Sequence, residues 1–293
     1  MIMRLMNNYL KIVLVMVLFS MMGGCGFMTT NRSSSVVQYL YPNTKGYIET
    51  PTIPRLALPL RVGIAFVPDD SVKGRSFFIP EKIVQGQNLT ERDKMELMEK
   101  VKKYFQKYEY VDSIELIPSS YLTKEGGFAN LDQIRTMYGI DVVVLLSYDQ
   151  TQFTDEGVTS VVYWTLIGAY LIPGEKNDTH TMVDATVYDI QSRKLLFRAP
   201  GTSHIKSKAT PVNLSEQLRV DSMASFKEAC TDLAVNLDKQ LELFSEKVKK
   251  TPADYEIVRK PGYTGGGSLD GIYLILLSIL GGYRIWQKTN HNA

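Results

Sequence analysis

Apolar residues recur at two spacings along the middle of the chain, and these spacings predict strands and helices in turn. Residues 60–67 form a compact apolar run that ends in a Pro-Asp-Asp turn, which is typical of a strand. Thr90 and Asp93 are spaced as a helix N-terminal capping pair. Apolar residues then follow at intervals of three and four: Met95, Met98, Val101, Phe105 and Tyr108. This pattern predicts a strand followed by an amphipathic helix.

The alternation continues toward the centre of the chain. Residues 111–117 are typical of a second strand, and residues 131–138 of a short helix that follows two glycines. Residues 141–148 contain five consecutive apolar residues, as expected of a strand buried on both faces. The order strand, helix, strand, helix, strand predicts an α/β fold with helices packed on a sheet.

The next part of the chain changes to β-type residues. Residues 158–172, 181–190 and 194–205 are rich in Val, Thr, Tyr and Ile, and the short links between them favour an antiparallel meander. The apolar stretch within 161–172 is too short to cross a membrane as a helix, so we expect a buried strand there. Residues 189–196 resemble the strand, turn and strand of several bacterial envelope lipoproteins with α/β domains.

A long helix is predicted after the meander. Its apolar stripe has a spacing of three and four residues: Phe226, Cys230, Leu233, Leu237, Leu241, Phe244 and Val248. A coiled coil or a partner-binding helix is the alternative, but the pattern lasts only about three heptads, which favours packing on the chain's own sheet. The fold class is therefore α/β (α+β): a mixed sheet, an antiparallel meander and a long C-terminal helix, within one domain over residues 60–250.

The flanking segments are predicted to be unstructured connections. Residues 25–59 begin with a polar run at 31–35 and are then interrupted by four prolines, which is typical of an extended tether. Residues 251–264 are interpreted as a linker on the other side of the domain.

Residues 1–24 have the order of a secretory signal, because Arg4 and Lys11 precede the apolar run 12–22. The run leads into two glycines and Cys25, and Met22-Gly23-Gly24-Cys25 resembles a bacterial lipobox. That resemblance implies cleavage by signal peptidase II, acylation of Cys25 by the lipoprotein acylation machinery and, with Gly26 next, transfer to the outer membrane. A plain signal peptide with an incidental cysteine is the alternative.

Residues 265–293 carry a second membrane signal. Gly265-Gly266-Gly267-Ser268 precede the apolar residues 269–286, which are just long enough to span a bilayer, and Arg284 and Lys288 give the end its positive charge. This order resembles the GlyGly C-terminal sorting signal read by rhombosortases, which are rhomboid-type intramembrane proteases. Together with the lipobox, it resembles the rhombotarget lipoprotein family and implies cleavage near Gly265, Gly266, Gly267 and Ser268. An ordinary C-terminal anchor after a Gly-Ser linker is the alternative.

Composition limits the possible partners of the domain. The chain has 293 residues and a formal charge of +2. The two end signals carry more positive charge than the chain as a whole, so the residues between them have a net charge close to −1. A domain with this balance lacks the basic surface that nucleic-acid binding needs, and we expect no nucleic-acid partner. If Cys25 is acylated, Cys230 has no disulfide partner in the chain, and its place on the helix stripe indicates a buried apolar side chain.

No catalytic or metal-binding motif is recognisable. The three histidines, His180, His204 and His291, are not at metal-ligand spacing, and no nucleophile elbow or phosphate-binding loop follows a predicted strand. The sequence therefore predicts no catalytic residue, metal or cofactor, and favours a non-enzymatic envelope lipoprotein that acts as a binding or assembly module. The alternative is an envelope hydrolase that acts on glycans or phosphoesters through acidic residues: Asp69, Asp70, Asp155 and Glu156.

Overall fold

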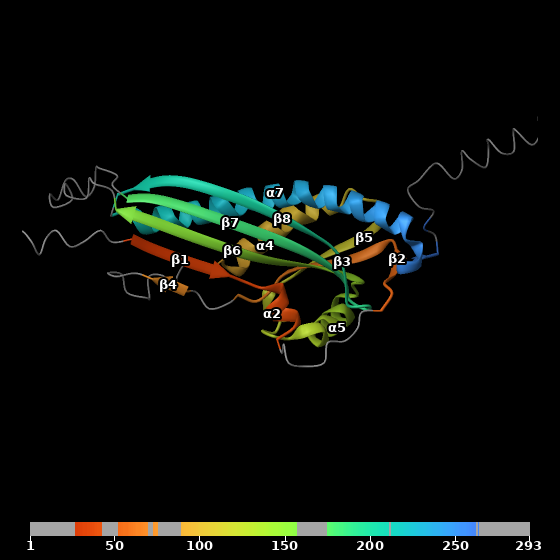
Figure 1. The fold of residues 1–293 in the computed structure, drawn as a ribbon. Coiled ribbons are helices and arrows are strands. Elements are labelled where there is room, and N and C mark those ends of the chain that lie inside the picture. The colour runs from red at the N-terminus through yellow and green to blue at the C-terminus, as the bar shows by residue number, and fades with distance from the viewer. Residues whose placement is uncertain are drawn as a thin grey trace, which may run out of the picture.

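The fold is a mixed β-sheet with helices on both faces (Figure 1). The computed structural model describes residues 27–42, 52–69, 73–75, 89–156, 175–210, 212–261 and 263. The strands among them are β1 (Phe27–Ser33), β2 (Arg55–Leu58), β3 (Leu60–Phe66), β4 (Lys73–Arg75), β5 (Val111–Ile117), β6 (Val142–Glu156), β7 (Glu175–Asp189), β8 (Lys194–Ala209) and β9 (Glu256–Arg259). The helices are α2 (Val36–Leu40), α4 (Glu91–Phe105), α5 (Gly127–Tyr138) and α7 (Leu214–Lys250), with short 3-10 turns at Ser119–Tyr121 and Pro252–Asp254.

Strand β6 is the centre of the sheet, and two different strands share one of its edges. Parallel β3 pairs with its first part, with Val62 opposite Val142, and antiparallel β1 pairs with its second part, with Ser33 opposite Asp149. Beyond them lie β5 next to β3 and β4 next to β1. The other edge of β6 continues into β7 and β8 as an antiparallel meander. The predicted mixed sheet is therefore confirmed, and so is the antiparallel pairing of the predicted strands at 181–190 and 194–205, which correspond to β7 and β8.

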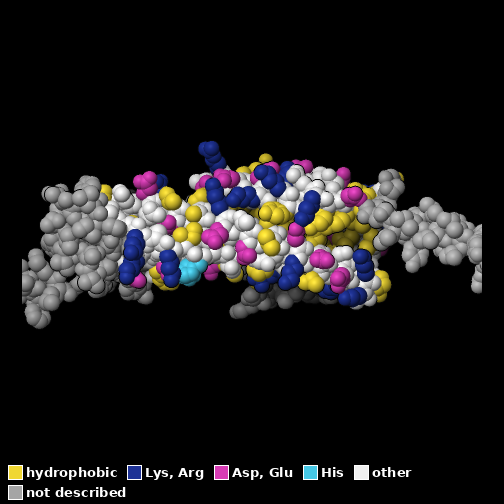
Figure 2. Space-filling view, turned by 90° about the horizontal axis from the view of Figure 1, so that it is seen from above, with side chains coloured by type: hydrophobic (Ala, Val, Ile, Leu, Met, Phe, Trp, Pro, Cys, Tyr) yellow, Lys and Arg dark blue, Asp and Glu magenta, His cyan; other side chains and the backbone are white. Residues whose placement is uncertain are grey.

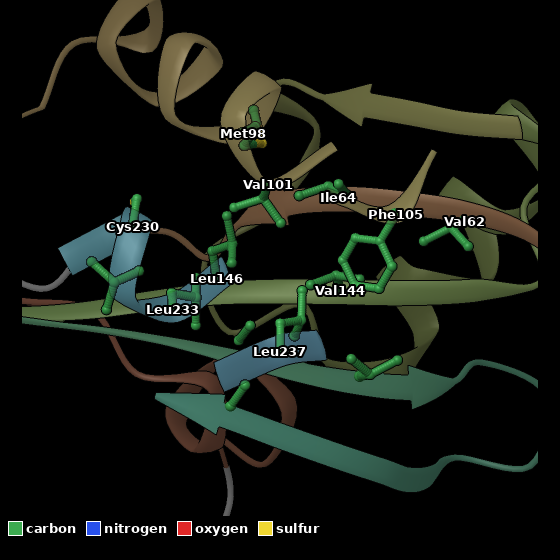
Figure 3. Close-up of a cluster of buried hydrophobic side chains, with 14 of the residues drawn as sticks. Val62, Ile64, Met98, Val101, Phe105, Val144, Leu146, Cys230, Leu233 and Leu237 are labelled. Carbon is green, nitrogen blue, oxygen red and sulfur yellow. The ribbon is translucent and has the colours of Figure 1, made fainter. Parts of the chain in front are cut away.

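Each face of the sheet has its own hydrophobic cluster. On one face, α4 and α7 pack against alternate residues of β3 and β6, and Figure 3 shows Phe105, Val144 and Leu237 in this cluster. On the other face, α2 and α5 cover the intervening residues, such as Ala65 and Val143. The stripe predicted for the long helix is thus directed to the sheet, with Phe226, Cys230, Leu233 and Leu237 all buried.

Local signals explain where the helices begin and end. Thr90 caps α4 as predicted, because its Oγ1 accepts a hydrogen bond from the amide of Asp93 (3.2 Å) while its own amide donates to Oδ2 of Asp93 (3.0 Å). The helix ends at Phe105, before Tyr108, which had been expected on the same stripe. Helix α5 ends at Tyr138 and is capped by Gly139, whose φ of 65° is the left-handed conformation that glycine adopts readily.

The interior of the sheet's second half is polar. Gln152 donates from Nε2 to Thr179 Oγ1 (3.2 Å) and to the carbonyl of Leu218 in α7 (2.9 Å). Arg32 of β1 donates to Oε1 of the same glutamine (2.7 Å) and to Ser222 Oγ (3.2 Å). In this half of the sheet, hydrogen bonds therefore join α7 to the strands, whereas apolar contacts join them in the other half.

The segment predicted to be a tether is largely part of the fold, and that prediction was wrong for the residues described. β1 and α2 lie within 25–59, and Val36, Tyr39 and Leu40 are buried against α5 and the sheet. β2 pairs in parallel with β9, which lies in the predicted linker 251–264. These strands were missed because they are short or polar. The predicted strand at 158–172 lies outside the described residues.

Candidate functional site

A cavity of about 240 Å³ opens between the C-terminal half of α7 and the sheet. Figure 2 shows a hollow surrounded by hydrophobic side chains toward one end of the molecule. The residues that line it come from β2, β3, β5 to β9, α4 and α7, from the turn before β5 and from the segment after β9: Leu56, Leu58, Leu60, Val62, Phe105, Tyr110, Val111, Val142, Val144, Val187, Leu196, Phe197, Leu241, Phe244, Ser245, Val248, Lys249, Ile257 and Tyr263. The lining is therefore almost entirely apolar.

The small parallel pair β2–β9 forms part of the cavity wall, together with α7. Leu241, Phe244 and Val248 recur on one side of α7 at the spacing predicted from the sequence. Aromatic contacts fix this wall, since the ring of Phe244 lies 5.3 Å from that of Phe197 and 5.5 Å from that of Tyr255. The cavity is thus bounded by aromatic and aliphatic side chains.

Few polar groups reach the cavity. Ser245 and exposed Lys249 lie on α7 at its margin, and Tyr110 lines it from the other side. Burial raises the pKa of Tyr110, so this phenol stays neutral. The residues described around the cavity include no carboxylate, histidine or cysteine. This arrangement can hold an apolar molecule with a polar or anionic end, and it offers no acid and base pair for catalysis.

The two end signals predicted from the sequence fall outside the described residues. This applies to Cys25 and to the sorting motif at Gly265, Gly266, Gly267 and Ser268. Among the helices that are described, none combines the length and the apolar character needed to cross a bilayer.

Of the acidic residues considered for a hydrolase, the two whose side chains the structure describes, Asp69 and Asp155, lie far apart. Asp69 lies beside Ser34, whereas Asp155 pairs with Phe27 at the other end of β1, so the length of that strand, roughly 20 Å, separates them. Asp69 accepts a hydrogen bond from the buried ammonium of Lys94 (3.1 Å). Asp70 and the side chain of Glu156 are outside the described residues. Asp69 is therefore explained as half of an ion pair.

Cys230 behaves as the sequence predicted. Its side chain is fully buried in the cluster beneath α7, and burial raises the pKa of the thiol to about 12. A thiol that stays protonated is a poor nucleophile.

A cluster of side chains that the sequence analysis did not predict lies on β7 and β8. His180 stands directly opposite His204, and both Nε2 atoms lie near Oδ1 of Asp178, at 3.1 Å and 2.5 Å. A one-residue irregularity between Val187 and Tyr188 sets this register. Without that irregularity, His180 would lie opposite Ser203. The spacing of the histidines along the chain, on which the sequence prediction rested, does not reveal a pair formed across two strands.

Comparisons with known proteins give little to transfer. No protein-family model matches the chain, and no curated protein matches its sequence. Among solved structures, it is similar to the crystal structure of a homologue of neuraminyllactose-binding hemagglutinin from Helicobacter pylori. The two chains are 9% identical with a TM-score of 0.33, over 71% of this chain and 96% of the other. A similarity this low transfers neither a fold nor a ligand.

Proposed function

We propose that this chain is an envelope lipoprotein whose domain binds one amphiphilic molecule, with an apolar chain in the cavity and an anionic head group near Lys249. The observation that carries the proposal is a cavity of about 240 Å³ whose lining is apolar except at its margin. Soluble domains normally fill such space, and an unfilled apolar space is the usual form of a ligand site.

The size of the cavity favours a slender ligand. It is larger than an engineered apolar cavity of about 150 Å³ that binds benzene, and slightly below the range of about 300–1,000 Å³ typical of drug-sized ligands. Each methylene transferred from water to such a site contributes about 0.8 kcal/mol. A single acyl chain fits these limits better than a fused ring system or a peptide.

A photo-reactive fatty acid tests the proposal. The full chain, reconstituted in lipid nanodiscs, is irradiated with a diazirine fatty acid, and labelled peptides are located by mass spectrometry. We expect labelling of α7 near Leu241 and of β9 near Ile257, which both line the cavity. Leu241→Trp should fill the space and reduce labelling about tenfold, equivalent to about 1.4 kcal/mol of affinity.

Leu243→Trp is the matched control, because Leu243 lies on the same helix, is 50% exposed and is not among the lining residues. Equal labelling of the two variants would contradict the proposal. Truncation after Tyr263 tests whether the chain's own C-terminal segment occupies the cavity. If only the truncated chain is labelled, that segment and not a fatty acid is the natural occupant.

The envelope location and the processing at both ends are parts of the same proposal and are supported by the sequence patterns at Cys25 and at Gly265 to Ser268. Intact-mass analysis of the mature protein tests both ends at once. Cys25→Ser should remove the lipid label, because a hydroxyl cannot form the thioether. Gly266→Val with Gly267→Val should leave the full-length form, because bulky β-branched residues resist the unwinding that cleavage requires. Recovery of wild-type protein that still carries His291 would refute C-terminal processing.

A further inference from the structure

Two histidines and one aspartate converge on the face of the sheet opposite α7. Thr179 and Thr181 of β7 are buried beneath α7, so the alternate residues Asp178 and His180 lie on the other face. His204 joins them from β8, directly across from His180. The cluster therefore belongs to two neighbouring strands whose register is fixed over fifteen residue pairs.

The geometry of the three side chains is already close to that of a metal site. The ligand atoms of Asp178, His180 and His204 all lie within 4.8 Å of one another. A tetrahedral ion with bonds of about 2.0–2.1 Å separates its ligand atoms by about 3.4 Å, which is near the spacing of these three atoms. Because an imidazole binds a metal in the plane of its ring, the two rings would turn out of their stacked arrangement when the ion binds. The imidazole rings are stacked with their centroids 4.0 Å apart and their planes at 16°, so both present the Nε2 edge to the same carboxylate oxygen.

Surrounding contacts and exposure suit an exchangeable ion. Phe153 of β6 packs edge-on against the ring of His180, with centroids 6.2 Å apart, and limits its rotation. The side chains of His180 and His204 are 50% and 44% exposed, so water can complete the coordination. Three protein ligands with one open position are typical of zinc sites that keep a solvent ligand.

We propose that Asp178, His180 and His204 bind one transition-metal ion of the Zn²⁺ class across β7 and β8. In the protein without metal, the imidazoles hydrogen-bond to the carboxylate; each ring can carry its hydrogen on Nδ1 instead, which leaves both Nε2 lone pairs for the ion. Two imidazoles and a carboxylate favour Zn²⁺ or Cu²⁺ over Mg²⁺ or Ca²⁺, which prefer all-oxygen sites. The ion would cross-link β7 and β8 on the sheet face that α7 does not cover.

Calorimetric titration of the chelator-treated full chain with Zn²⁺ tests this proposal. We expect one ion per chain, and His180→Ala or His204→Ala should weaken binding about tenfold or more, since even changes beyond the direct ligands cost that much. His204→Gln, which keeps a polar side chain on the strand, should give the same loss. Substitution with Co²⁺ gives a second readout, because visible absorption reports nitrogen and oxygen ligation directly.

His291→Ala is the matched control, because it removes the third histidine of the chain, which lies in the C-terminal tail. It should bind Zn²⁺ as the wild type does. The proposal is overturned if the double variant His180→Ala, His204→Ala binds as tightly as the wild type, if His291→Ala abolishes binding, or if the wild type shows no stoichiometric binding.

Discussion

The ammonium of Lys94 lies 3.1 Å from Oδ2 of Asp69 and joins α4 to the segment that follows β3. The lysine side chain is only 5% exposed and the aspartate side chain 21%, and Lys94 also donates to Ser119 Oγ at 3.3 Å. Removal of one partner leaves a largely buried charge without compensation. We expect Lys94→Met to destabilise the protein by about 3–5 kcal/mol, measured by urea denaturation.

A double-mutant cycle checks this explanation. Lys94→Met combined with Asp69→Leu should cost clearly less than the sum of the two single changes, because neither charge then remains. Additive effects would show that the two charges do not interact, and would reopen a separate role for Asp69.

Asp141 should make stability depend on pH. Burial raises the pKa of its carboxyl, but the hydrogen bonds of Arg61 (3.0 and 3.2 Å) and the charge of Lys260 outweigh burial and hold the pKa below its ordinary value. A depressed pKa in the folded state stabilises the protein above the unfolded pKa of about 3.9, and this contribution is lost as the pH falls through the folded value.

Asp141→Asn should therefore lower the urea midpoint at pH 7, and its difference from the wild type should shrink as the pH falls below about 4. Asp155→Asn, at an exposed position in β6, the strand that follows Asp141, is the control and should change the midpoint little. A difference that stays constant with pH would rule out the charged carboxylate as its source.

A substitution at Leu237 tests which face of α7 packs on the sheet. It is 2% exposed within the cluster between α7 and the sheet, so Leu237→Asp should bury an uncompensated charge and unfold the domain at a cost of several kcal/mol. Leu243→Asp, at a 50% exposed position on the same helix, should leave thermal melting nearly unchanged. Equal melting of the two variants would contradict the packing of α7 described above.

Gly201 of β8 allows α7 to approach the sheet. A Cβ atom at this position would lie 2.2 Å from the carbonyl oxygen of Ala229 and 2.3 Å from the amide nitrogen of Leu233, both in the helix backbone. We expect Gly201→Ala to push the helix outward and cost about 1–3 kcal/mol or more, measured by thermal denaturation. The neighbouring substitution Thr202→Ala, at an exposed position, should have little effect; a neutral Gly201→Ala would mean that the helix can shift freely.

Sequence patterns predicted the half of the fold with an apolar interior and missed much of the other half. The strand at 111–117 and the helix capped by Thr90 were predicted with nearly their observed bounds, because their buried faces are apolar. The second part of β6 and the first turns of α7 bury Gln150, Gln152 and Ser222 instead. Hydrophobic periodicity carries no signal where hydrogen bonds build the interior.

The candidate sites were hidden for a different reason. The lining of the cavity comes from segments as distant as Leu56 and Ile257, which become neighbours only when β2 pairs with β9. The pairing of His180 with His204 depends on a register that a single irregular residue sets. Both are long-range consequences of strand pairing, which residue spacing does not encode.

The two ends of the described chain lie at opposite ends of the long helix. Phe27 pairs with Asp155 near the start of α7, and Tyr263 lines the cavity with Lys249 near its end, so the 37 residues of α7, roughly 55 Å, separate them (Figure 1). Under the processing proposed above, and before C-terminal cleavage, a lipid at Cys25 and a membrane segment from Leu269 would hold the domain lengthwise along one bilayer. Cleavage at the glycines would release only the end of the domain that contains the cavity. The domain would then be free to rotate about its single remaining attachment, the lipid at Cys25.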